Sequence, residues 1–190
     1  MRKSRVETAE TRRRIVEVAA GEFRAKGIHA TGLADLMASA GLSHGGFYRH
    51  FDSKDQLVAE ACEAGLSGIV VALEAAADGC NGADGFKAVV DAYMSTAHRD
   101  TPEGGCPLAS MGSELARADE ITRAAATRGY DELVDMLAKR MGNPEETADR
   151  SRAVFALAAM IGALTMSRII ADPDASASLL EDVKQHVEAI

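Results

Sequence analysis

Apolar residues recur along the chain at the three- to four-residue spacing of amphipathic helices. Over residues 8–26, for example, Ile15, Ala19 and Phe23 form one apolar stripe, and Gly27 follows where a C-terminal cap is expected. Breaks rich in Gly, Pro, Asn and Asp separate such segments. The pattern predicts further helices over residues 32–40, 44–50, 54–77, 83–98, 107–116, 119–140 and 145–171, with a last helix after the break at 172–174. The chain is therefore predicted to be all-α.

Several helix starts carry recognisable capping residues. Thr31 and Ser43 are expected to cap the second and third helices. Ser53 and Gln56 fit a capping box at the start of the fourth. A break at Gly142, Asn143 and Pro144 is expected to end the seventh helix.

Composition supports a helical fold, and the charge divides the chain in two. Aromatic residues are only 4% and Trp is absent, which disfavours a sheet sandwich. The net charge is −8, but residues 1–57 carry ten Lys and Arg against seven Asp and Glu, a net of +3. Residues 58–190 carry eleven against twenty-two, a net of −11. A basic head for a polyanion and an acidic body are predicted.

Cysteine usage and the N-terminal sequence favour the reducing cytoplasm. Cys62, Cys80 and Cys106 have no paired spacing, and no C-x-x-C motif is present. The basic N-terminus leads into no apolar segment of the kind found in secretory signals. The apolar run 153–167 is shorter than a membrane span and is predicted to be a buried helix, so no membrane partner is expected.

The segment 31–54 predicts a function. Its two short helices meet at Ala40, Gly41 and Leu42, a turn that lets helices cross steeply, as in a helix-turn-helix over about residues 31–50. Such a motif presents the start of its second helix to the DNA major groove. The residues expected to contact DNA bases or phosphates are Thr31, Ser43, His44, Gly45, Tyr48, Arg49, His50 and Lys54.

Other interpretations of this segment are weaker. Gly45 and Gly46 lie inside a predicted helix rather than in a strand-to-helix loop, which disfavours a nucleotide-phosphate site. His44 and His50 have no third residue suitably spaced for a metal, and no metal is expected. The run Arg12–Arg14 fits a solvated face and a phosphate contact equally well.

The chain resembles the TetR family of bacterial transcriptional regulators. The resemblance rests on Thr31, the Asp35–Leu36 pair, residues 40–43, Gly45, and the runs 47–51 and 53–57. It implies an all-α homodimer of nine to ten helices, with a DNA-binding domain over residues 8–68 and a ligand-binding and dimerisation domain over 69–190. It also implies a repressor that a small-molecule inducer releases from a palindromic operator. Gly46 replaces a larger side chain of many relatives, which puts more weight on DNA shape.

Two sets of residues in the second domain are expected to bind the inducer and to form the dimer interface. Candidate lining of the inducer pocket is Phe86, Tyr93, Met94, Cys106, Met111, Leu115 and Tyr130. The small apolar face of helix 145–171 is expected to pair with a second copy, because a palindromic site needs a two-fold protein. Its residues are Phe155, Ala159, Met160, Gly162, Ala163 and Met166.

Cys106 precedes Pro107 at a predicted helix start, after Gly104 and Gly105. A thiol at a helix N-terminus gains reactivity from the helix dipole, and glycines would leave it accessible. We therefore consider a sensor of electrophiles or oxidants, beside the alternative of a buried structural cysteine.

No enzyme signature is present: the chain has no nucleophile elbow, H-E-x-x-H motif, Walker loop or dinucleotide fingerprint. No cofactor is expected. The remaining alternative is a helical protein-interaction adaptor without DNA binding, which the basic head disfavours. The sequence leaves open whether a ligand releases DNA or promotes its binding.

Overall fold

A computed structural model describes residues 5–142 and 146–190, and all regular structure within them is helical. The small head contains α1 (Arg5–Lys26), α2 (Leu33–Ser39) and the 3₁₀ helix η1 (His44–Arg49). The long helix α3 (Lys54–Ala76) leads from the head into the body. The expected break at Asn143 and Pro144 and the expected helix start at Glu145 lie outside the described residues.

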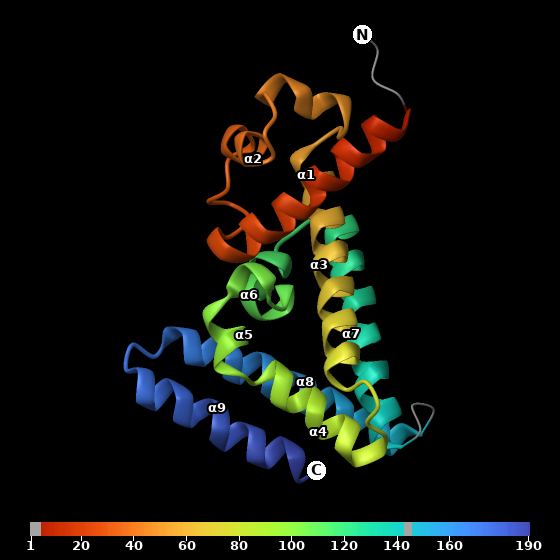
Figure 1. The fold of residues 1–190 in the computed structure, drawn as a ribbon, viewed down its shortest axis with the longest axis vertical. Coiled ribbons are helices and arrows are strands. Elements are labelled where there is room, and N and C mark those ends of the chain that lie inside the picture. Colours follow the sequence, from red (N-terminus) through yellow and green to blue (C-terminus); the bar gives the residue numbers. More distant parts are fainter. Residues whose placement is uncertain (1–4, 143–145) are drawn as a thin grey trace.

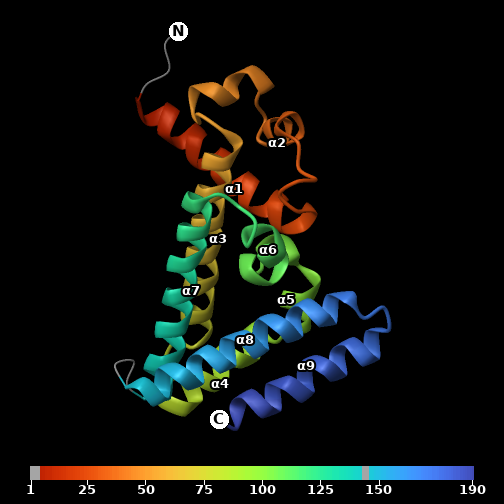
Figure 2. The ribbon, with the colours of Figure 1, turned by 180° about the vertical axis from the view of Figure 1, so that it is seen from behind.

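The body contains the remaining helices. These are α4 (Gly82–Tyr93), α5 (Thr96–Asp100), the 3₁₀ turn η2 (Pro102–Gly104), α6 (Pro107–Leu115), α7 (Glu120–Met141), α8 (Thr147–Ile169) and α9 (Pro173–Glu188). Figures 1 and 2 both show α3 and α7 side by side, with α4, α8 and α9 crossing at the end away from the head. Helices α3 and α7 run in the same direction, since Glu63 pairs with Arg128 and Glu74 with Arg140.

Local sequence accounts for most helix ends. Gly27 has φ +89° and its N–H donates to the Phe23 carbonyl at 2.8 Å, so it ends α1 as predicted. Ser53 accepts the Gln56 N–H at 3.1 Å, while the Gln56 side chain accepts the Asp52 N–H at 2.8 Å. The predicted capping box is thus present with its second bond shifted by one residue.

Two boundaries differ from the sequence prediction. Gly32, not Thr31, caps α2. Ser43 occupies the N-cap of η1 as predicted, although its side chain makes no capping hydrogen bond. The single helix predicted over 83–98 is two helices. Ser95 accepts the His98 N–H at 3.1 Å, which starts α5 and ends the α4 pattern at Tyr93.

Helices α3 and α8 are long and apolar enough to cross a membrane by length and composition alone. The most apolar part of α3 is 50% buried within the molecule, between α1 and α7, and that of α8 is 39% buried. Core helices of globular proteins meet the same criteria, so this is weak evidence for a membrane span.

Candidate nucleic-acid interface

The head exposes a compact polar surface on η1 and the residue before it. Ser43, His44, Gly45, Tyr48 and Arg49 are all exposed, and Tyr48 keeps 66% of its surface accessible. We call these five residues the recognition surface. All five were predicted from the sequence as DNA-binding residues.

Aromatic packing beneath the recognition surface fixes its outward direction. Phe47 and Phe51 are buried and stack with ring centroids 5.5 Å apart. The Tyr48 ring meets Phe47 edge-on at 5.1 Å. The two glycines of η1 disfavour an α-helix, which is consistent with its 3₁₀ geometry.

Two predicted DNA-binding side chains are used inside the protein. Thr31 is 3% exposed, and its hydroxyl donates to the Gly27 carbonyl at 2.7 Å. The Lys54 ammonium donates to the carbonyls of Ile28 at 2.6 Å and Thr31 at 2.7 Å. Both side chains therefore hold the turn between α1 and α2, and the expectation that they contact phosphates is corrected.

His50 is half-buried at the end of η1 and stays a predicted DNA contact. Its carbonyl accepts from Arg12 Nε at 3.2 Å. The Arg12 guanidinium also lies 4.6 Å from the centre of the Phe51 ring and forms an ion pair with Glu60 at 2.5 Å. Arg12 thus ties α1 and η1 to α3, whereas Arg14 of the same basic run is exposed.

The body holds a half-buried polar cluster around His98. His98 Nε2 accepts the Cys106 N–H at 3.0 Å, which leaves Nδ1–H to donate to the Tyr93 carbonyl at 2.7 Å. Burial lowers the pKa of His98, so the ring is neutral at pH 7. Arg168 donates to the His98 carbonyl and to the Ser110 hydroxyl, each at 2.9 Å. The cluster joins α4, α5, α6 and α8.

The accessibility and activation considered for Cys106 as a sensor are not found, whereas its burial agrees with the alternative of a structural cysteine. Its side chain is fully buried, and burial raises the pKa of the thiol. The dipole of α6 does not offset this desolvation, because the thiol has left water entirely. The Tyr93 hydroxyl is buried beside the Cys106 thiol, and burial raises the pKa of Tyr93. A reagent would reach the Cys106 thiol only if the packing around it opens, so its role as a sensor stays a prediction.

Six of the seven predicted pocket residues are packed in the core. Phe86, Tyr93, Met94, Cys106, Met111 and Leu115 are each 5% exposed or less, whereas Tyr130 is half-buried. Met94 also borders a groove of about 520 Å³ between α4 and α9.

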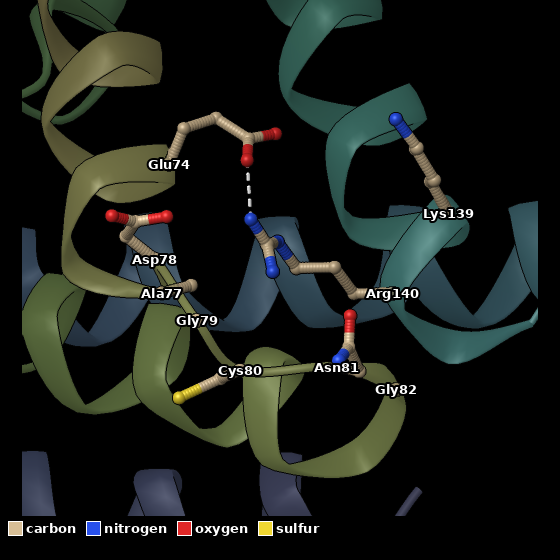
Figure 3. A pocket seen from close by; sticks show the side chains of 9 residues that line it. All are labelled: Glu74, Ala77, Asp78, Gly79, Cys80, Asn81, Gly82, Lys139 and Arg140. Atoms are coloured by element: carbon tan, nitrogen blue, oxygen red, sulfur yellow. Dashed lines mark hydrogen bonds and ion pairs between the residues drawn. The ribbon is translucent and has the colours of Figure 1, made fainter.

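Another cavity, of about 330 Å³, lies where α3 and α7 end. In Figure 3 the Arg140 side chain reaches from α7 to Glu74 of α3, and the Cys80 thiol points away from this ion pair. None of the predicted pocket residues borders this cavity.

The predicted dimerisation helix, α8, has one exposed apolar face. Phe155 is 59% exposed, Met166 50% and Ile169 67%, and Gly162 lies exposed between them. Ala159 is half-buried beside this face. Met160 and Ala163 are buried in the core of the protomer, so the expectation that they lie in an interface is corrected.

Comparisons with known proteins agree with these features. Residues 15–61 match the family model of bacterial regulatory proteins of the tetR family. Residues 82–186 match that of the LmrA/YxaF-like transcriptional regulators, C-terminal domain. The HTH-type transcriptional regulator Rv0196 of Mycobacterium tuberculosis is 30% identical over 172 residues, covering 85% of this chain and 86% of that protein. The chain belongs to the TetR family.

Solved structures share the fold, among them a TetR transcriptional regulator. This regulator, from Chloroflexus aurantiacus, has a TM-score of 0.78 at 29% identity, covering 96% of this chain and 94% of that one. Reduced NemR of Escherichia coli has a TM-score of 0.76 at 21% identity, covering 95% and 96%. The protein is therefore a DNA-binding transcriptional regulator, and its family is one of regulators rather than enzymes.

Sequence reasoning missed the residues that join head and body. Arg24 of α1 donates to the Glu103 carbonyl, and Glu114 of α6 accepts from the backbone of Ile28 and His29. These pairs are about 80 residues apart in the chain, and no sequence spacing indicates them.

The three thiols of this TetR-family protein are expected to differ sharply in reactivity. Cys80 is exposed, whereas Cys62 and Cys106 are buried, and burial raises the pKa of Cys62 to about 11. Titration with an aromatic disulfide reagent at pH 8 should therefore show one fast thiol in the native protein and the others only after unfolding. The Cys80→Ser variant should show no fast thiol. A second fast thiol would mean that the core opens readily and would restore Cys106 as an accessible sensor.

Proposed function

We propose that this TetR-family protein is a homodimeric repressor that binds a palindromic operator in the cytoplasm and is released from it by a small-molecule inducer. The observation that carries the proposal is the recognition surface, which gathers five exposed polar or small residues on a head of net charge +3. The exposed apolar face of α8 supports the dimer, since an unpartnered apolar face is stabilised by a second copy.

That the protein represses transcription is proposed from its membership of the TetR family. The body is acidic, with a net charge of −11 over residues 58–190, so it is the head that faces DNA. The predicted pocket residues that lie in the core, Tyr93 among them, remain candidates for contact with an inducer. The core would have to open to admit that inducer. The adaptor alternative has no observation in its favour, because a protein–protein adaptor needs no basic head.

Selection from a random pool of duplex DNA tests the proposal. Reduced protein at moderate salt is expected to recover an inverted repeat, because each protomer presents the same recognition surface. Recovery of no sequence by folded, dimeric protein would contradict operator binding and favour the adaptor.

Arg49→Ala is expected to weaken binding to all sequences by a similar factor. A phosphate contact carries no sequence information, so its loss should also reduce the slope of log affinity against log salt by about 1. Lys139→Ala is the charge-matched control, because Lys139 is exposed at the far end of α7 (Figure 3). An unchanged salt slope with Arg49→Ala would show that Arg49 does not contact phosphate.

A further inference from the structure

The head is attached to the body by two polar joints, both at the end of α1. In the first, Arg24 Nε donates to the Glu103 carbonyl at 2.8 Å, and its Nη2 donates to the same oxygen. In the second, the Glu114 carboxylate accepts the N–H groups of Ile28 at 3.0 Å and His29 at 2.9 Å. Of the two partners in the body, Glu103 lies in η2 and Glu114 in the last turn of α6.

The second joint binds the turn between α1 and α2, which α3 also binds. Glu114 binds the N–H groups of the turn after Gly27, whereas Lys54 of α3 binds the carbonyls of Ile28 and Thr31. A side chain at Gly27 would come within 3.0 Å of a Glu114 oxygen. The turn between α1 and α2 therefore cannot shift without breaking bonds to α3 and α6 together.

The first joint depends on a missing side chain in α3. A Cβ atom at Gly65 would overlap the Arg24 guanidinium and lie 2.9 Å from Pro107 Cγ. Glycine is unfavourable within a long helix, so a buried glycine there needs a reason. Gly65 provides the space through which α1 reaches the start of α6.

We propose that these joints fix the orientation of the head on the body and so set the spacing of the two recognition surfaces in the dimer, which makes Arg24, Gly65 and Glu114 positioning residues for operator binding. The inference rests on the proposed dimeric operator binding. When the heads are held at the spacing of the two half-sites, binding of the first head brings the second to its site at high effective concentration. When the heads rotate freely on the body, this effective concentration falls, although each head still recognises its own half-site.

The test compares the full selected operator with the same duplex carrying one scrambled half-site. Gly65→Ala displaces Arg24 without removing any joint residue, and Glu114→Ala removes the second joint. Each is expected to lower affinity for the full operator by about tenfold and to leave half-site affinity within about twofold. Gly68→Ala is the matched control, since a Cβ at Gly68 of the same helix meets nothing within 4 Å. Glu114→Gln, which keeps one acceptor oxygen, should restore part of the loss.

Two results would overturn the inference. One is full-site affinity equal to wild type in both Gly65→Ala and Glu114→Ala. The other is an equal fall of full-site affinity, half-site affinity and thermal midpoint, which would mean that these residues only support folding. Failure of the wild-type protein to select any operator would instead overturn the proposed function.

Hydrogen exchange tests the joint without DNA. In Glu114→Ala the amides of Ile28 and His29 are expected to exchange faster, while amides in α3 and α7 keep their protection. Unchanged protection at Ile28 and His29 would overturn the second joint whatever the operator result.

Discussion

Phe155→Glu is expected to convert the dimer to monomers and to lower operator affinity by at least about a hundredfold. Phe155 is 59% exposed on the apolar face of α8, which also exposes Gly162 and Met166 further along the helix. In a two-fold interface the substitution occurs twice and buries two unpaired carboxylates, at a cost of several kcal/mol. A monomer also loses the gain from binding two half-sites at once.

Light scattering after size-exclusion chromatography, together with operator titration, measures both effects. Ile121→Glu is the control, because Ile121 is a 73% exposed apolar residue on α7, away from the face of α8. A carboxylate in the first turn of a helix is tolerated or favourable, so this variant should stay dimeric. A Phe155→Glu protein that remains dimeric would show that α8 does not form the interface through this face.

Lys54→Met is expected to lower the free energy of unfolding by about 2–4 kcal/mol, because two part-buried carbonyls lose a charged donor. The ammonium bonds the carbonyls of Ile28 and Thr31 at 2.6 and 2.7 Å, and methionine keeps the length of the side chain without the donor. Urea unfolding at one fixed protomer concentration measures the loss.

This substitution also separates the two roles considered for Lys54. A phosphate contact would reduce the salt slope of operator binding by about 1 and leave stability unchanged. The internal role lowers stability and leaves the slope unchanged. Lys26→Met is the control, since Lys26 is exposed and pairs with Glu22 of its own helix, so its loss should change stability by less than about 0.5 kcal/mol. A stable Lys54→Met protein with a shallower slope would contradict the structural role.

The comparison of sequence with structure shows which features are local. Helix existence, the C-terminal glycine of α1 and the Ser53 cap were predictable, because each depends on residues within one or two turns of chain. The outward direction of Tyr48 and Arg49 was predictable for the same reason, since Phe47 and Phe51 supply the apolar side of η1. The family resemblance came from the same short segment.

Two of the errors have a common origin in contacts between distant segments. Cys106 has a sequence typical of an accessible thiol, but its burial depends on α4, α5 and α8 closing over it with His98 and Arg168. Lys54 was expected to contact DNA, but its ammonium binds two carbonyls that lie 23 and 26 residues away in sequence. The error on α8 is different: at about 100° per residue, Met160 and Ala163 lie roughly 140° and 80° around the helix from Phe155, so helical geometry itself separates them from the exposed face.

The sequence by itself thus determined the helices, the basic head and the residues that the head exposes. These follow from propensity, periodicity and charge, which act over a few residues and can be recognised along the chain. Only the tertiary structure decided which polar side chains remain free for DNA and how the head is held on the body. The Arg24 and Glu114 joints depend on donors and acceptors that only folding brings together. A hydrogen bond forms only when the donor and acceptor are placed to within a few tenths of an ångström.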